Sequence, residues 1–569
     1  MNYVKKRRDF DPARHAAYTA LMQVATDDAY ANLVLPAILR ERGLRPLDAA
    51  FATELTYGTL RMQGKYDSII ARSATRPLDQ LDPAVAVLLR LGAHQLLTLR
   101  IAPYAAVGET VALARQVTSD GPAKMINAVL RRLSERSPQE WDELLEATEG
   151  ADERRAAVHS HPEWVVRALT QALKVAGRGD EIDALLEANN LPPQVCLVAR
   201  PGLVEPVDLA RTAARVLRTR ATAGVISPYA VNIAGGDPAR LHEVRGAEAA
   251  VQDEGSQMVA AVLASAPLDG PDERWLDLCA GPGGKTALLA GLAGARGVEL
   301  LANEVTAHRA DLVRQSVRPS AERVEVRTGD GRELGEEKEG YFDRTLVDVP
   351  CSGLGSLRRR PEARWRRQPR DIADLAPLQR ELLAAAIKAT RPGGIVGYAT
   401  CSPHVAETHV VVQEAIAKGL VKPLDAVEVA RMVASWREDF AFGRVSDSLA
   451  GTGKAGRVNE DVDCCFTPVN GAGAAAENGR EGDVVQLDGE ETGLANGSAP
   501  AEAAGPDTDG HAGEVGRAAA SSQPDQETAA GAEAGEPQFT AEFGQGPFLQ
   551  LWPHVNGTDA MFLALLEVQ

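Results

Sequence analysis

Two cysteines stand just beyond apolar runs and could do covalent chemistry. Cys351 lies in "DVPCSGLG" (348–355) and Cys401 lies in "GYATCSPHVAE" (397–407). The runs before them, "RTLVDV" and "GIVGYAT", are typical of short buried strands. A thiolate is a strong nucleophile, but a free thiol stays mostly protonated at neutral pH unless positive charge or a helix N-terminus stabilises the anion. The spacing leaves open which cysteine reacts, and packing is the alternative for either one taken singly.

A glycine loop follows an earlier apolar run, in "WLDLCAGPGGKTALLAGLAG". A phosphate-binding loop of the Walker A type is excluded because Cys279 stands where its first glycine is needed. A dinucleotide fingerprint is excluded because Thr286 replaces its third glycine. What remains is a tight turn at a helix N-terminus, whose amides could meet a carboxylate such as that of S-adenosylmethionine. The residues predicted to line this cofactor site are Cys279, Ala280, Gly281, Pro282, Gly283, Gly284 and Lys285.

Acidic residues end the next predicted strands. Glu304 is placed to hold a ribose diol, Asp330 in "TGDGRE" to meet an adenine edge, and Asp348 closes the strand before Cys351. Any one of them alone is more often a turn or cap residue. Three acidic strand ends after one glycine loop favour a shared site at one edge of a parallel sheet.

An arginine-rich segment comes directly after Cys351. Residues 356–370, "SLRRRPEARWRRQPR", hold seven arginines and one glutamate. So dense a cluster suits phosphate neutralisation, and a tryptophan within it could stack on a base; a solvated charge run is the alternative. The predicted RNA-binding residues are Arg358, Arg359, Arg360, Arg364, Trp365, Arg366 and Arg367.

The elements that must position these residues divide the chain into several parts. Helical periodicity dominates residues 1–140, which predicts an all-α bundle. Residues 155–250 mix helix and short strands, which predicts a small α+β connecting domain. From 251 to 468 strands and helices alternate, as in an α/β Rossmann-like domain with a parallel doubly wound sheet. Residues 469–537 lack Phe, Tyr and Trp and predict a disordered insertion, whereas 538–569 are apolar again and predict the final strand of the same domain.

The distribution of charge matters more than its total. The formal net charge is −18, but residues 469–537 hold 14 acidic and 2 basic residues and so account for −12 of it. Residues 1–140 hold 19 basic and 14 acidic residues, a net of +5. An acidic total therefore does not argue against a nucleic-acid partner.

Cysteine usage and hydropathy set the expected compartment. Six cysteines without a Cys-x-x-Cys pair predict reduced thiols, no disulfide framework and no metal site. The basic N-terminus "MNYVKKRRDF" lacks the apolar stretch of a signal peptide, and no run of 18 apolar residues occurs. We expect a cytoplasmic protein without a membrane partner, and we expect a monomer.

Several motifs together resemble a known family. The segments "LDLCAGPGGKT", "DVPCSGLG", "RRRPEARWRR" and "YATCS" are similar to those of the Sun-type RNA cytosine-C5 methyltransferases, the bacterial ribosomal RNA small-subunit methyltransferase B enzymes. The resemblance covers roughly residues 251–466 and 539–569. Residues 9–140, with "VGETVALA" and "MINAVLRRL", resemble the NusB-type helical RNA-binding domain of the same family.

The resemblance implies an activity and assigns roles. It implies methylation of cytosine C5 in RNA, with S-adenosylmethionine as cofactor and small-subunit ribosomal RNA as partner. By resemblance Cys401 is the nucleophile that adds to C6, Cys351 assists release of the product, and Asp348 holds the edge of the base. The alternatives are a transfer RNA substrate, or an inactive RNA-binding, antitermination-like factor.

Three departures from the family pattern stand out. Gly281 stands where alanine is usual, and Glu304 stands where aspartate is commoner. The segment "SPHVAET" after Cys401 replaces a typical Pro-Glu-Glu-Asn run, so the helix expected after Cys401 is less certain. The sequence names neither the target nucleotide nor a role for the acidic insertion or for Cys464 and Cys465.

Overall fold

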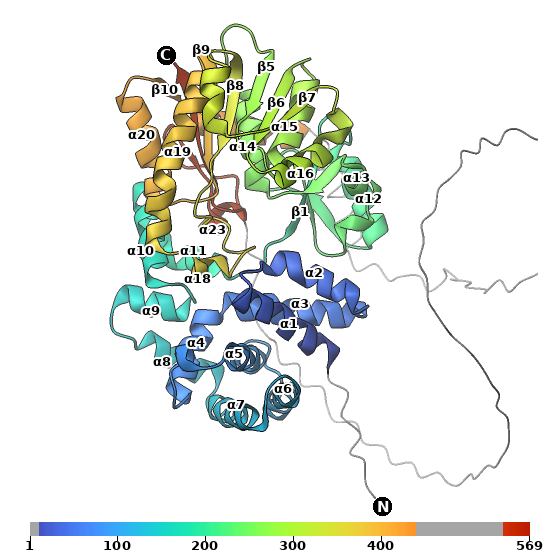
Figure 1. Cartoon of the computed structure of the whole chain (residues 1–569), viewed down its shortest axis with the longest axis vertical. Coiled ribbons are helices and arrows are strands. Elements are labelled where there is room, and N and C mark those ends of the chain that lie inside the picture. Colours follow the sequence, from blue (N-terminus) through green and yellow to red (C-terminus); the bar gives the residue numbers. More distant parts are fainter. Residues whose placement is uncertain (1–10, 440–538) are drawn as a thin grey trace, which may run out of the picture. The chain divides into compact units, whose positions relative to one another are not determined.

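The computed structural model describes residues 11–439 and 539–569. The basic N-terminal arm, Cys464, Cys465 and the acidic tract 469–537 lie outside the described residues. Contacts divide the chain into Met1–Gly453 with Gln538–Gln569, and Lys454–Pro537. The described residues all belong to the first of these units (Figure 1).

The N-terminal part is a bundle of helices. They are α1 (Pro12–Thr26), α2 (Ala31–Glu41), α3 (Pro46–Arg61), α4 (Gln63–Ser73), α5 (Pro83–Leu97), α6 (Pro103–Val117), α7 (Asp120–Leu133) and α8 (Pro138–Glu146). Proline is the first residue of α1, α3, α5, α6 and α8, where its fixed φ suits the first turn and its missing N–H removes no helical hydrogen bond. Helix α5 is apolar nearly all round and packs against α1, α3, α4, α6 and α7, so it forms the centre of the bundle.

The connecting segment divides between two cores. Its helices α9 (Ala151–Val158), α10 (Glu163–Val175) and α11 (Ile182–Ala188) precede a four-stranded antiparallel sheet of order β2-β3-β1-β4. The strands are β1 (Val195–Ala199), β2 (Ala221–Ala223), β3 (Ala230–Ile233) and β4 (Ala249–Val251), with α12 (Pro206–Leu217) packed against β1, β2 and β3. Helices α10 and α11 instead share a buried cluster with Leu354, Leu357 and Trp552. These helices therefore support the loop after Cys351 rather than the small sheet.

The C-terminal part is built on a large sheet of order β10-β12-β9-β8-β5-β6-β7. Its strands are β5 (Arg274–Asp277), β6 (Glu299–Glu304), β7 (Val324–Thr328), β8 (Phe342–Asp348), β9 (Thr390–Thr400), β10 (Val421–Leu424) and β12 (Phe562–Val568). From β7 to β9 all neighbours run parallel, and their near-continuous apolar sequence fits burial on both faces.

Helices cover both faces of this sheet (Figure 1). The core on one face includes α14 (Glu254–Ser265), α15 (Gly284–Gly294), α16 (Ala307–Val317) and α21 (Ala426–Asp439). The core on the other face includes α19 (Pro369–Ala389) and α20 (His409–Ala417). Helix α20 follows Cys401 after a short 3₁₀ turn, Val405–Glu407, in spite of the unusual sequence there.

Strand β12 comes from the last residues of the chain, yet it lies inside the sheet. It pairs antiparallel with β9 on one side and with β10 on the other, and the short β11 (Leu549–Gln550) also pairs with it. Phe562, Leu563 and Leu565 are fully buried. The sheet of the described residues is therefore completed by chain that follows the undescribed segment.

Two classes of feature are missing from the described ranges. Within residues 11–439 and 539–569 no helix combines the length and the apolarity needed to cross a membrane. The same residues contain no group of three or more His, Cys, Asp or Glu side chains that could hold a metal ion.

Candidate active site

The register of two parallel strands brings the two cysteines together. Asp348, the last residue of β8, lies opposite Ala399 of β9. Both chains then turn out of the sheet at the same edge, and Cys351 Sγ lies 3.3 Å from Cys401 Sγ. A thiol donating to a neighbouring sulfur stabilises the thiolate form of the acceptor.

The two thiols differ in how readily they ionise. The hydrogen bond between them and burial both raise the pKa of Cys351 well above its usual value. The same hydrogen bond lowers the pKa of Cys401, and Lys285 acts in the same direction against the effects of burial and Asp348. The surroundings of Cys401 therefore favour its thiolate form, whereas those of Cys351 favour the thiol.

Lys285 and Asp348 form an ion pair beside the thiols. Lys285 Nζ lies 2.8 Å from Asp348 Oδ2, and the two side chains are 14% and 27% exposed. Burial lowers the pKa of Lys285, but the Asp348 carboxylate outweighs burial, and the net shift is upward. The ammonium group thus keeps its charge where it can stabilise the Cys401 thiolate.

The glycine loop connects β5 to α15 through a left-handed turn. Gly283 has φ +103°, and a Cβ there would lie 2.9 Å from the Cα of Val313, so a side chain is excluded on two grounds. Thr286 Oγ1 donates to Asp277 Oδ2 over 2.7 Å, which anchors α15 to the end of β5. Helix α15 therefore begins directly at the glycine loop, with the amides of its first turn at the end of β5.

The Glu304 side chain, at the end of β6, is hydrogen-bonded to this loop. Its carboxylate is 3% exposed and accepts hydrogen bonds from the backbone N–H of Gly281 at 3.1 Å and of Thr306 at 3.0 Å. Arg309 lies 3.5 Å from it and also donates to the Gly281 carbonyl at 2.6 Å. The acid and the loop are thus held in one fixed arrangement.

Asp330 has different hydrogen-bond partners from the other two acids. It accepts the backbone N–H of Arg332 at 2.9 Å and forms an ion pair with the Arg332 guanidinium at 2.6 Å. These hydrogen bonds lower its pKa. Of the sequence-predicted acids, Glu304 and Asp348 are the last residues of β6 and β8, whereas Asp330 lies two residues beyond the end of β7. Asp348 is the one that borders the thiols.

Cys279 and Cys196 do not belong to the reactive pair. Burial raises the pKa of both thiols well above the usual value. Cys279 nevertheless stays in the predicted lining of the glycine loop, together with Ala280 and Pro282, whereas Cys196 packs in β1.

The arginine-rich segment joins parts of the protein that are distant in sequence. Arg364 is fully buried and donates to the carbonyls of Arg61 and Ser160, at 3.2 and 2.8 Å, and to Asn190 Oδ1 at 2.8 Å. Burial, with Arg61 nearby, lowers its pKa to about 9. Arg358 is 4% exposed and donates to the Gly557 carbonyl. Side chains so placed cannot reach a phosphate, so Arg358 and Arg364 drop out of the expected RNA surface.

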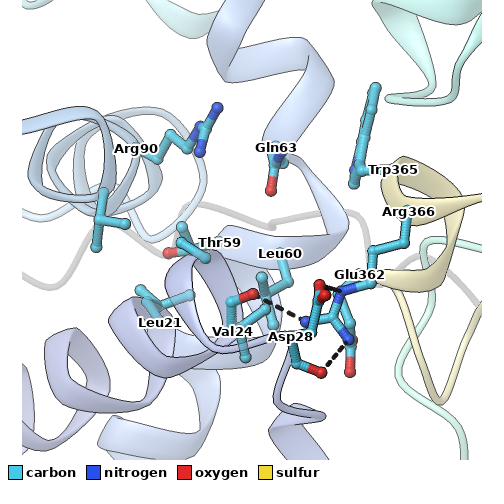
Figure 2. A pocket seen from close by; sticks show the side chains of 12 residues that line it. Leu21, Val24, Asp28, Thr59, Leu60, Gln63, Arg90, Glu362, Trp365 and Arg366 are labelled. Atoms are coloured by element: carbon cyan, nitrogen blue, oxygen red, sulfur yellow. Dashed lines mark hydrogen bonds and ion pairs between the residues drawn. The ribbon is translucent and has the colours of Figure 1, made fainter. Parts of the chain in front are cut away.

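Arg366 and Trp365 face the N-terminal helices. Figure 2 shows the Arg366 side chain pointing at Asp28 and Val24, and it donates to the Val24 and Ala29 carbonyls at 2.8 and 2.6 Å. The Trp365 ring lies so close to Gly64 that a Cβ on Gly64 would be 2.3 Å from it. Both side chains border a pocket of about 230 Å³ that also includes Thr59, Leu60 and Gln63 (Figure 2). Their placement serves docking of the two parts of the chain.

Three arginines of the segment keep exposed surface. Arg359 has a side chain 38% exposed and pairs with Asp559. Arg360 is exposed, with its guanidinium 5.5 Å from the centre of the Tyr30 ring. Arg367 is partly exposed and donates to the Ser352 carbonyl at 3.0 Å. These three remain candidates for contact with RNA.

Comparisons with known proteins identify both parts of the chain. Residues 264–438 match the family described as 16S rRNA methyltransferase RsmB/F, and residues 11–135 match the NusB family. The chain is 33% identical over 397 residues to the ribosomal RNA small subunit methyltransferase B of Enterobacter sp. (strain 638), covering 68% of this chain and 86% of that protein. The chain belongs to the RsmB/F family of RNA methyltransferases.

Other relatives agree with this assignment. The Mycobacterium tuberculosis (strain H37Rv) protein named "Putative methyltransferase Rv1407" is 50% identical over 422 residues, 74% of this chain and 90% of that protein. The crystal structure of PH0851 has the same fold, with a TM-score of 0.65, 17% identity and 98% of each chain covered. As an RsmB/F methyltransferase, the protein uses S-adenosylmethionine.

The residues around the glycine loop of this RsmB/F methyltransferase fit that cofactor. Amides at the start of α15 suit its carboxylate, and Glu304 suits a ribose diol. One buried oxygen beside the loop, Gln252 Oε1, has no hydrogen-bond partner among the described residues. An unmatched buried acceptor at this edge of the sheet is what a donor-bearing ligand would satisfy.

Sequence reasoning missed three polar residues of the site. Asp277 sits inside an apolar run, and burial raises its pKa to about 7. Glu407 lies in the segment that departs from the family pattern, and Asp559 precedes β12; they are 0% and 1% exposed. For Asp277 the sequence signal was a carboxylate within an apolar stretch. No local pattern showed which residues Asp277, Glu407 and Asp559 would contact.

Proposed function

We propose that the protein methylates cytosine C5 in small-subunit ribosomal RNA through a covalent bond between Cys401 and C6 of the base. The observation that carries the proposal is the pair of thiols 3.3 Å apart at the ends of β8 and β9, beside the Lys285–Asp348 ion pair. A lone nucleophile would need only one thiol. Two adjacent thiols suit a reaction in which a covalent bond must form and later break.

The chemistry divides among the side chains in order. Cytosine C5 is a weak nucleophile until the Cys401 thiolate adds to C6, which makes C5 electron-rich. Asp348 holds the N3/N4 edge of the base and so favours that addition. S-adenosylmethionine supplies the methyl group that C5 accepts. A base then removes the C5 proton, the C–H electron pair restores the C5–C6 double bond, and the S–C6 bond breaks.

Cys351 acts in the last stage. Because burial and its hydrogen bond to Cys401 keep Cys351 protonated, it donates to the Cys401 sulfur as negative charge returns there. This donation assists departure of the Cys401 thiolate from C6. The role explains why a second cysteine lies within hydrogen-bond distance of the first.

The substrate assignment rests on relatives and on exposed charge. The alignments of this chain with relatives named ribosomal RNA small subunit methyltransferase B cover most of the length of those relatives. Arg359 and Arg367 offer guanidinium groups beside the loops of the thiols, and Arg360 offers an exposed one in the same segment, for a backbone phosphate. The target base must leave its stack to reach Cys401, since both thiols are partly covered by protein.

Replacement of each cysteine tests the reaction. Cys351→Ala, incubated with labelled 16S ribosomal RNA and S-adenosylmethionine, should give a retarded RNA–protein species on a denaturing gel. Cys401→Ala should give neither this species nor methylated product, while binding the cofactor nearly normally. Methyl transfer at the wild-type rate by Cys401→Ala would overturn the assignment of the nucleophile.

Bisulfite sequencing tests the substrate. Ribosomal and transfer RNA from a deletion strain should be compared with RNA from the same strain carrying the wild-type gene. One protected cytosine lost from 16S ribosomal RNA supports the proposal. A loss confined to transfer RNA, or no loss, contradicts it.

A further inference from the structure

One buried carboxylate joins the two loops that carry the cysteines. Glu407 is fully buried. It accepts the backbone N–H of Ser352 at 2.8 Å, the Ser352 hydroxyl at 2.5 Å and the Ser402 hydroxyl at 2.6 Å. Gln379 of α19 donates a fourth hydrogen bond over 3.1 Å. Four donors on two oxygens match an ionised carboxylate, which can only accept.

The serines that Glu407 binds directly follow the cysteines in the chain. Ser352 follows Cys351, and Ser402 follows Cys401. The two serine hydroxyls also meet each other at 3.0 Å. Anchoring both serines to one rigid acceptor fixes where the preceding thiols lie, and so fixes the sulfur–sulfur distance.

The carboxylate does not stand symmetrically between the loops. Ser352 contributes its backbone N–H and its hydroxyl, whereas Ser402 contributes only its hydroxyl. The ammonium of Lys285 stabilises the Cys401 thiolate. Glu407 therefore holds the loop of Cys351 by one hydrogen bond more than the loop of Cys401.

We propose that Glu407 is a positioning residue that holds the thiols at hydrogen-bond distance and keeps their shared proton on Cys351, so that Cys401 is the thiolate. Two chemically identical groups 3.3 Å apart cannot both lose a proton easily, and a small difference in local field decides which one does. Glu407 supplies that difference through its two hydrogen bonds to Ser352, the residue after Cys351. The proposal rests on the proposed role of Cys401 as the nucleophile.

Other charged groups also act on the pair. Glu407 is among the groups that raise the pKa of Cys351. Asp348 raises the pKa of both thiols. Titratable or charged neighbours on the surrounding elements include Lys285 on α15, Tyr398 on β9, Arg359 and Arg367 in the segment after β8 and Asp559 before β12.

Alkylation of the full-length protein by iodoacetamide tests the proposal without RNA. The rates at Cys351 and Cys401 should be followed by peptide mass spectrometry from pH 6 to 10. In the wild type, Cys401 should react faster than Cys351 at pH 7 by about tenfold or more, since the thiolate is the reactive form. Equal rates, or faster reaction at Cys351, overturn the proposal whatever the variants do.

Glu407→Gln removes the charge and keeps the shape of the side chain. We expect the Cys401:Cys351 rate ratio at pH 7 to fall about fivefold or more, with the Cys401 profile moving to higher pH. Ser402→Ala is the matched comparison, because it removes one anchored hydroxyl and leaves the charge of the carboxylate. It should lower the ratio less than Glu407→Gln does; an equal fall in both variants would show that packing, not charge, sets the preference.

Failure of this inference is distinguishable from failure of the proposed function. A wild-type preference for Cys401 that Glu407→Gln leaves intact overturns the role of Glu407 alone. Absence of the RNA adduct in Cys351→Ala overturns the covalent mechanism alone. Melting temperature and S-adenosylmethionine binding of each variant show that it is folded before it is alkylated.

Discussion

The side chain of Glu304 fills the space into which a Cβ atom on residue 281 would project. A Cβ built on Gly281 would lie 2.3 Å from Glu304 Oε2 and 2.9 Å from Arg309 Nε. The same oxygen accepts the Gly281 N–H at 3.1 Å. The two departures from the family pattern therefore compensate each other, because the longer acid needs the smaller loop residue.

Gly281→Ala should weaken cofactor binding because its methyl group displaces Glu304. We expect the dissociation constant for S-adenosylmethionine, measured by calorimetry, to rise about tenfold or more, which is about 1.4 kcal/mol. Gly281→Ala/Glu304→Asp should recover most of that loss, since aspartate withdraws the clashing oxygen. A double variant as weak as the single one would refute the compensation.

Gly294→Ala provides a control for that experiment. Gly294 ends α15, and a Cβ there would meet nothing within 4 Å. This alanine should leave the affinity for S-adenosylmethionine unchanged. A similar loss in Gly294→Ala would mean that α15 tolerates no added methyl group and that Glu304 is not the cause.

Asp277 should make stability depend on pH. Its pKa rises from 3.8 to about 7 in the folded protein because of burial. The folded state thus keeps a proton that the unfolded state loses, and the contribution of Asp277 to stability is full below about pH 4 and is lost as pH rises through about 7. The free energy of unfolding of Asp277→Asn, measured with urea, should rise by about 2 kcal/mol relative to that of the wild type between pH 5 and pH 8. A difference between variant and wild type that does not change with pH would contradict the raised pKa of Asp277.

Arg360→Gln should weaken RNA binding through a single phosphate contact. The side chain is exposed in the segment that follows Cys351, so its loss should reduce the slope of log K against log salt by about 0.7–0.9. Filter binding from 50 to 300 mM salt measures the slope. Arg370→Gln is a matched control at the edge of the same segment, where the structure shows only a 3.9 Å ion pair with Asp371. An unchanged slope for Arg360→Gln would remove Arg360 from the RNA surface.

A chain ending at residue 468 should not fold into an active enzyme. It lacks β12, the strand that lies between β9 and β10. The loss of this strand would leave two unpaired strand edges and expose the apolar surface that Phe562 covers. We expect aggregation on expression, whereas replacing residues 469–537 by a short Gly/Ser linker should preserve methyl transfer. A soluble and fully active 1–468 fragment would show that β12 is dispensable.

Local patterns were enough to predict the elements and the kind of site. Apolar runs followed by polar turns gave the strands before Cys351 and Cys401, and helical periodicity gave the N-terminal bundle. The glycine loop could be assigned because backbone turns depend on neighbouring residues alone. Where a short motif carries its own geometry, the order of residues is sufficient.

Contacts between distant segments were decided only by the tertiary structure. Arg364 lies in the same arginine-rich segment as Arg360, yet one is fully buried against Arg61 and Ser160 and the other is exposed. Glu407 meets Ser352 across 55 residues, and Asp559 meets Arg359 across 200. Charge density in a sequence is a local property, but the burial of each charge depends on which helix or strand packs over it. The sequence by itself thus determined the two thiols and their strands, while the three-dimensional packing decided which carboxylate and which ammonium group stand beside each thiol.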